Sequence, residues 1–221
     1  NITELTLKEA GDVYLREGYS MSDVFTTGIL QRGRDGKLVE EGNGYQVDRS
    51  QRIRLGSADP DFTMGWRHDI NYKNISLGLM ITGRFGGIVT SQTQAFMDAF
   101  GVSKVSAEAR DNGGVMLDGH RYDAERYYNT VGGQGLMSYY TYDATNVRLQ
   151  ELSLTYSLPK KWLGDVFNNA TISFVGRNLF MFYRKAPFDP DMNGSTGTYN
   201  RSDFFMAPSL RNLGFSIKFS L

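Results

Sequence analysis

The residues best suited to chemistry in this 221-residue sequence are oxygen donors near its C-terminal end. Asp189, Asp191 and Asn193 stand at alternate positions and Gly194 follows, which is how a calcium-binding EF-hand loop begins. Such a loop needs a bidentate Glu at its twelfth position, and Asn200 stands there instead. The motif is therefore an incomplete calcium candidate, and the alternative is an ordinary turn in a polar connection.

Catalysis and cofactor binding are not expected from the remaining residues. The sequence has no cysteine, which excludes disulfides, thiolate metal sites and a cysteine nucleophile. The sequence has two histidines, His68 and His120, which are too far apart to show the spacing of metal ligands. They therefore predict neither a metal site nor a catalytic base. Nucleophile-elbow and phosphate-loop motifs are absent. Lys plus Arg and Asp plus Glu number 24 each, so no basic excess indicates a nucleic-acid partner.

A cluster of tyrosines between residues 122 and 142 provides the candidate ligand contacts. Tyrosines in a surface loop stack on sugar rings or peptide side chains, or form a protein interface. The alternative is that the same rings fill the core of a self-packed loop, and the sequence leaves both open. The candidates are Tyr122, Tyr127, Tyr128, Tyr139 and Tyr140.

Strands must position these residues, and the last nine residues show the pattern most clearly. Apolar side chains alternate there with Gly, Ser or Lys, so one face is hydrophobic and the other small or polar. Nine to eleven tilted residues also suffice to cross a bilayer as a strand. A half-buried strand of a soluble sheet shows the same alternation. The apolar positions are Leu213, Phe215, Ile217, Phe219 and Leu221.

Two hairpins repeat this alternation further upstream. The first runs over 62–72 and 75–81 around a tight turn at Lys73-Asn74, and the second joins 152–158 to 172–182. Further strands are predicted within 1–16, 19–31 and 47–55. Residues 86–146 are predicted to be mostly loop, with a short helix near 94–100.

The lengths of the connections alternate along the chain. Those at 73–74 and 159–168 are short, and those at 32–61, 86–146 and 184–210 are long. Outer-membrane barrels alternate in this way, because their periplasmic turns are short and their external loops are long. The pattern favours an all-β, antiparallel transmembrane barrel.

Several ordered motifs resemble the SusC/RagA-like TonB-dependent transporters of Bacteroidetes outer membranes. The carriers of this resemblance are 146–160, Gly176-Arg177-Asn178-Leu179-Phe180 and Asp189-Pro190-Asp191. Ala207-Pro208 leading into the terminal strand, and Asp59-Pro60-Asp61-Phe62 upstream, are similar as well. We expect Arg177 and Asn178 to hydrogen-bond neighbouring strands rather than a ligand.

The resemblance implies that residues 1–221 are the C-terminal part of one 22-stranded barrel domain in the outer membrane. The plug domain and the N-terminal strands would then lie outside this chain. The implied function is import of an oligosaccharide or oligopeptide, with no reaction catalysed. The implied partners are a SusD-like surface lipoprotein, TonB acting through the plug, the nutrient itself and outer-membrane lipid.

Two alternatives remain at this level. One is a self-contained small outer-membrane β-barrel, and the other is a soluble all-β glycan-binding module.

In a bacterial barrel the C-terminal residue lies at the periplasmic end, which places all three long connections outside the cell.

Overall fold

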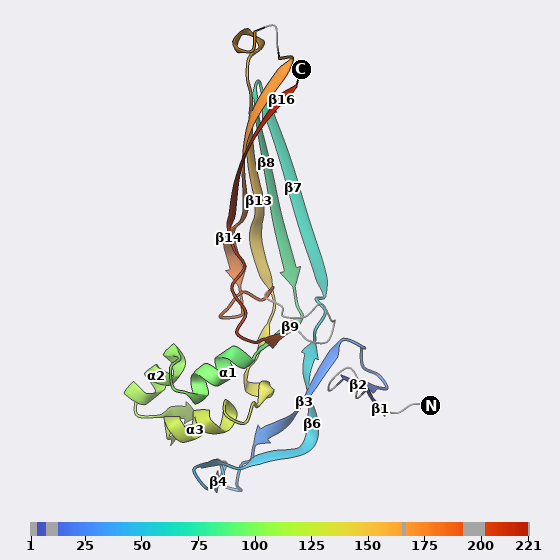
Figure 1. The fold of residues 1–221 in the computed structure, drawn as a ribbon. Coiled ribbons are helices and arrows are strands. Elements are labelled where there is room, and N and C mark those ends of the chain that lie inside the picture. Colours follow the sequence, from blue (N-terminus) through green and yellow to red (C-terminus); the bar gives the residue numbers. More distant parts are fainter. Residues whose placement is uncertain (1–3, 8–12, 165–166, 192–201, 221) are drawn as a thin grey trace. The chain divides into compact units, whose positions relative to one another are not determined.

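Long antiparallel strands dominate the computed structural model of this chain (Figure 1). The structure describes residues 4–7, 13–164, 167–191 and 202–220. The chain divides into two compact units. We name them the sheet unit (60–86, 144–192 and 207–221) and the mixed unit (1–59, 87–143 and 193–206).

The sheet unit contains one five-stranded antiparallel sheet in the order β16-β14-β13-β8-β7. Both predicted hairpins and the predicted closing strand are confirmed as members of it. A 3-10 helix, Lys160–Trp162, lies in the short connection between β13 and β14. The strands are β7 (Phe62–Tyr72), β8 (Ile75–Phe85), β13 (Asn146–Ser157), β14 (Asn169–Arg184) and β16 (Asn212–Ser220).

The turn between β7 and β8 is the predicted two-residue turn. Tyr72 pairs with Ile75 across it, and Lys73 has a φ of 51°, in the left-handed region that tight hairpin turns require. The Asn74 side-chain amide donates to the Ser157 carbonyl oxygen at 2.9 Å, which joins this turn to the end of β13.

The register gives the sheet two chemically different faces, because directly paired residues of antiparallel strands lie on the same face. One row across all five strands is apolar and the next is polar. The apolar row is Ile70, Leu77, Leu154, Phe174 and Phe215. The polar row is Asn71, Ser76, Thr155, Ser173 and Ser216.

The apolar face of this sheet is largely uncovered within the described residues. Ile217 is 49% exposed and Leu213 is 68% exposed, and other large side chains of this face are similarly accessible. A continuous apolar surface of this kind requires a partner or a lipid environment.

Residues 86–146 form a folded segment, so the prediction that they are mostly loop is wrong. Three helices and four short strands occupy most of it, and the predicted short helix is α1, which begins two residues earlier. The helices are α1 (Gln92–Ala99), α2 (Lys104–Asp111) and α3 (Ala124–Val131), with a 3-10 turn at Met137–Tyr139. The strands are β9 (Ile88–Ser91), β10 (Val115–Leu117), β11 (His120–Tyr122) and β12 (Thr141–Asp143).

Side-chain caps explain why such short helices form between glycines. Ser91, Ser103 and Asp123 each accept a hydrogen bond from the backbone N–H three residues further on. Each cap satisfies one of the free N–H groups at a helix start. A helix of eight residues has only about two turns, so its hydrophobic periodicity is short. The many glycines around these helices make that periodicity hard to recognise in the sequence.

The remaining strands of the mixed unit form small sheets. The strands predicted within 19–31 and 47–55 are present as β3 and β6, which pair antiparallel with each other, and β15 pairs parallel with β9. No helix in the described parts of the chain is long and apolar enough to span a membrane. The strands are β1 (Glu4–Leu7), β2 (Val13–Arg16), β3 (Asp23–Leu30), β4 (Glu40–Glu41), β5 (Gly44–Tyr45), β6 (Val47–Ser57) and β15 (Ser202–Asp203).

Candidate functional site

The tyrosine cluster lies in the hydrophobic core of the mixed unit. Tyr122, Tyr127, Tyr128 and Tyr140 are buried, whereas Tyr139 is partly exposed. The hydroxyl oxygens of Tyr122 and Tyr139 accept hydrogen bonds from the backbone N–H groups of Leu38 and Leu30, each at 3.1 Å. These tyrosines therefore join the helical segment to the β3–β6 region, and the proposal that all five contact a ligand stays a prediction.

α3 positions two of these rings. Tyr127 and Tyr128 lie on its buried face together with Val131. Gly132 follows, and a Cβ there would lie only 2.3 Å from the Ala95 carbonyl oxygen, so α1 and α3 approach closely because this residue has no side chain. Burial raises the pKa of Tyr128 and of Tyr140, and the nearby carboxylate of Asp98 raises both pKa values further.

A cavity of about 300 Å³ opens between α1, α2 and α3. Its wall combines buried side chains with exposed ones. Of the five predicted tyrosines, only Tyr128 belongs to this wall. The wall residues that matter chemically are Asp98, Phe100, Ser106, Arg110, Glu125 and Tyr128.

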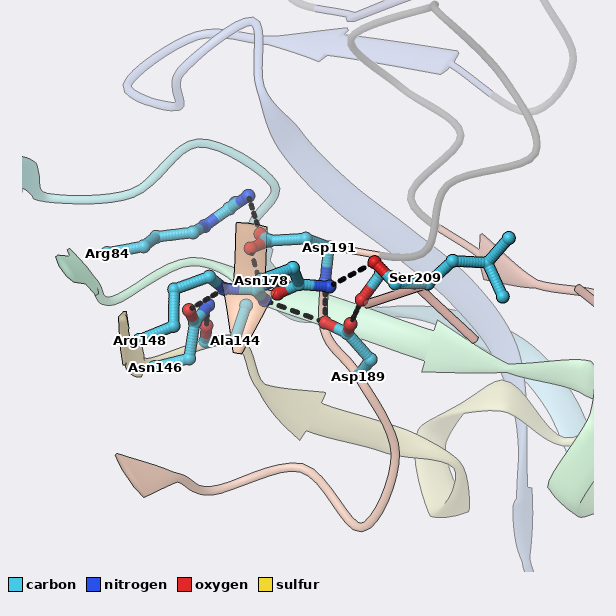
Figure 2. Close-up of polar contacts among 9 residues, drawn as sticks. Arg84, Ala144, Asn146, Arg148, Asn178, Asp189, Asp191 and Ser209 are labelled. Carbon is cyan, nitrogen blue, oxygen red and sulfur yellow. Dashed lines mark hydrogen bonds and ion pairs between the residues drawn. The ribbon is translucent and has the colours of Figure 1, made fainter. Parts of the chain in front are cut away.

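A second polar site lies in the sheet unit, where β13 begins (Figure 2). Arg148 belongs to the polar face, opposite Thr82 of β8 and Met181 of β14, and it is only 5% exposed. Its guanidinium contacts two carboxylates: Nη2 lies 2.8 Å from Asp189 Oδ1 and 2.5 Å from Asp191 Oδ2. We name Arg148 and the residues around it the Arg148 cluster, which consists of Arg84, Asn146, Arg148, Asn178, Asp189, Asp191 and Ser209.

Side-chain amides complete the coordination of Arg148. Its Nη1 donates to Asn178 Oδ1 at 3.2 Å, and its Nε donates to Asn146 Oδ1 at 3.3 Å. Arg84 Nη1 lies 3.9 Å from Asp191 Oδ1. Two arginines thus face two aspartates, which balances the formal charge of the cluster. A buried charge that is paired and hydrogen-bonded in this way avoids most of its desolvation cost.

The two aspartates differ in their electrostatic environment. Burial alone would raise the pKa of Asp189, but hydrogen bonds from Ser209, Arg148 and the Asp191 backbone N–H together hold this pKa below its ordinary value. The side chain of Asp191 is 40% exposed. Its pKa is raised, because partial desolvation outweighs the attraction of Arg148 and because Asp189 repels a second negative charge.

The incomplete calcium motif falls partly within this cluster. Asp189 and Asp191 both contact the Arg148 guanidinium, so a cation of the protein itself already occupies the space between them. Asn193 and Gly194, the next two positions of the motif, lie outside the described residues. Within the described ranges, no group of three acidic or histidine side chains is arranged to hold a metal ion.

Asn178 illustrates how the strand sequence builds this site. It lies at an irregularity between β13 and β14 and has a φ of 54°, a left-handed conformation that Asn tolerates better than most residues. Its amide nitrogen donates to the Leu210 carbonyl oxygen at 3.3 Å, and the neighbouring Arg177 donates to Glu151 Oε2 at 2.9 Å. Both residues therefore bind neighbouring parts of the sheet unit, as expected.

Sequence reasoning missed two functional features. It placed Asp189 and Asp191 in a turn but did not identify Arg148 as their partner. The available signal was a cation at a polar-face position of a strand, 41 residues before the first of two aspartates at alternate positions. It also passed over Asp98, because an acidic residue in a short amphipathic segment carries no motif.

Comparisons with known proteins agree with the sequence motifs. No protein-family model matches the chain. TonB-dependent receptor P3 of Formosa agariphila is 29% identical over 188 residues, and TonB-dependent receptor P26 of the same organism is 26% identical over 156 residues. These matches include 81% and 69% of this chain, but only 18% and 15% of the receptors.

Solved structures give the same answer for the fold. The RagAB peptide importer in its open-open state superposes with a TM-score of 0.64 at 17% identity, over 100% of this chain and 24% of the solved one. A structure of the RagAB peptide transporter superposes with a TM-score of 0.62 at 14% identity, over 99% of this chain and 24% of the solved one. The predicted resemblance is confirmed. This chain is similar to TonB-dependent receptors in sequence and to RagAB in fold.

The two sites of this chain have different structural roles. The Arg148 cluster ties the segment after β14 and the segment before β16 to the polar face of the sheet, through Asp189 and Ser209. The cavity lies in the mixed unit, in a segment inserted between β8 and β13. The chain spans less than a fifth of the curated receptors that it matches.

Proposed function

We propose that this chain forms part of the wall and of the external loops of an outer-membrane, TonB-dependent nutrient importer. The observation that carries the proposal is the two-faced sheet, whose apolar face is largely uncovered by the described residues and whose polar face holds buried charges. A soluble sheet has the reverse arrangement, with its apolar face in the core. A barrel wall places apolar side chains in lipid and polar ones in the lumen.

The ends of the strands support the assignment of the loops. The short connections at 73–74 and 158–168 leave the sheet at one end, and the segments 86–145 and 185–211 leave it at the other. We infer from this arrangement that, within a 22-stranded barrel, the turns lie in the periplasm and the long connections lie outside the cell. The mixed unit then meets external nutrient, and the Arg148 cluster holds one of the external connections against the wall.

The substrate class is an oligosaccharide or an oligopeptide, and RagAB is itself described as a peptide importer. By the resemblance, a SusD-like lipoprotein covers the external side, and TonB supplies energy through a plug outside this chain. The relatives are receptors and transporters, which accords with import without catalysis.

An uptake experiment tests the function. Cells lacking the full-length receptor should fail to accumulate one labelled oligosaccharide or oligopeptide, and re-expression should restore accumulation only in cells with an active TonB system. Unchanged uptake across a panel of both classes would contradict the proposal.

Cysteine labelling tests the topology, and because this chain has no native cysteine, only the introduced cysteine within it can react. In the full-length receptor, any cysteine outside this chain is first replaced. A membrane-impermeant thiol reagent should then label Asp111→Cys on intact cells and leave Lys160→Cys unlabelled until the outer membrane is opened. The opposite result would invert the proposed topology.

A further inference from the structure

The cavity of the mixed unit contains a buried negative charge. Asp98, in the last turn of α1, is 4% exposed and lines the cavity. Its Oδ1 accepts a hydrogen bond from Gln94 Nε2 at 2.8 Å. Among the residues that the structure describes, no cation lies within ion-pairing distance of its carboxylate. A buried carboxylate without a counter-charge is costly, so a cationic group that enters the cavity is stabilised there.

The surroundings of Asp98 strengthen this negative potential. The C-terminal end of a helix carries a partial negative charge, and Asp98 adds its own charge at that end of α1. The Asp98 carboxylate also raises the pKa of Tyr128 and Tyr142, after burial as the larger cause. The part of the cavity wall around Asp98 is therefore electronegative.

The rim of the cavity offers further contacts for a cation. Glu125 of α3 adds a second carboxylate, and Phe100 is 79% exposed at the rim. Aromatic rings attract ammonium groups, and Phe100 and Tyr128 both line the cavity. Arg110 also lines the cavity, and its Nη1 donates to the Gly101 carbonyl oxygen at 2.7 Å. Two carboxylates against one guanidinium leave a net negative charge in the wall.

We propose that this cavity binds the primary ammonium group of a small ligand, with Asp98 as its counter-ion. Such a group is found both on the amino terminus or lysine side chain of a peptide and on an amino sugar. The volume of about 300 Å³ admits a small molecule or the end of a larger one. Shape and charge of the mixed unit carry this inference, which does not depend on transport.

Calorimetry on the purified full-length receptor tests the proposal with two matched pairs of probes. Triglycine is compared with N-acetyltriglycine, and glucosamine with N-acetylglucosamine, because acetylation removes only the ammonium charge. At least one amine should bind, and its acetylated partner should bind at least about tenfold more weakly. The pair that responds identifies the source of the ammonium group.

Asp98→Asn keeps the shape of the side chain and removes its charge. The affinity for the responding amine should fall about 10- to 100-fold, as expected for the loss of a charge-assisted hydrogen bond. Asp111→Asn is the matched control, because Asp111 is an exposed residue of α2 outside the cavity wall, and affinity should change less than about twofold.

Glu125→Gln decides the matter if Asp98→Asn lowers the melting temperature, since Glu125 is exposed and tolerates substitution. It should weaken amine binding in the same direction. The proposal is overturned if neither amine binds, if acetylated and free amines bind equally, or if both carboxylate variants bind like the wild type. None of these results bears on uptake, so they are distinguishable from a failure of the transport proposal.

Discussion

The sheet unit and the mixed unit place their apolar residues in opposite environments. In the sheet unit, Leu213 is 68% exposed and charged Arg148 is buried. In the mixed unit, Leu136 is 0% exposed, and aromatic and aliphatic side chains surround it in a closed core. Large apolar residues are therefore exposed in the sheet unit and buried in the mixed unit. The mixed unit buries its apolar residues as a water-soluble domain does, whereas the sheet exposes them on one face, which is the arrangement expected of a face in contact with lipid.

The largest expected effect comes from the buried charge of the sheet unit. Arg148→Met removes the partner of two aspartates, and opening of the flanking segments should become easier by about 3–5 kcal/mol. Amide hydrogen exchange over 185–191 and 205–211 of the full-length receptor measures this change. Arg177→Met is the control, because the Arg177 side chain is 64% exposed and its pair with Glu151 is worth about 0.2–1 kcal/mol. Equal effects of the two substitutions would contradict a special structural role for the Arg148 cluster.

Removing a large side chain from the core of the mixed unit should destabilise that unit. Leu136→Ala should destabilise this unit by about 2–5 kcal/mol, because the residue is fully buried against the tyrosine core. Hydrogen exchange of α3 measures the loss, and the strands of the sheet should keep their protection. Uniform loss over both units would mean that they unfold together.

The lipid face should respond to charge. Ile217→Arg should cost about 2–4 kcal/mol near the bilayer midplane, measured by folding of the receptor into lipid vesicles. Ser216→Arg, one residue earlier and on the polar face, should cost much less. Equal sensitivity at both positions would contradict the assignment of the faces.

The smallest expected effect is a dependence on pH. The pKa of Asp189 is lower in the folded state than the value of about 3.9 of an unfolded chain. Its contribution to stability is therefore complete above this value and is lost as the pH falls through the folded pKa. The protection factors of the amides over 185–191, which are corrected for the pH dependence of intrinsic exchange, should fall below about pH 4. Asp189→Asn should remove this fall, and its persistence in that variant would assign it to another group.

Local sequence was sufficient for the strands of the sheet. Alternation over 62–72, 75–81, 152–158 and 213–221 predicted them, because the side-chain period of a strand is a property of neighbouring residues. The local sequence also predicted the tight turn at Lys73-Asn74 and the hydrogen bonds of Asn178 to neighbouring parts of the sheet unit. Helices α2 and α3 were missed, because two-turn helices depend on packing rather than on periodicity.

The sequence by itself determined the two faces of the sheet, the alternation of short and long connections, and the SusC/RagA-like resemblance. Only the tertiary structure decided that four of the five candidate tyrosines are buried, that Arg148 joins Asp189 and Asp191, and that Asp98 lines a cavity. The physical reason is distance along the chain. A strand is specified by adjacent residues, whereas an ion pair across 41 positions or a cavity between three helices exists only after the chain has folded.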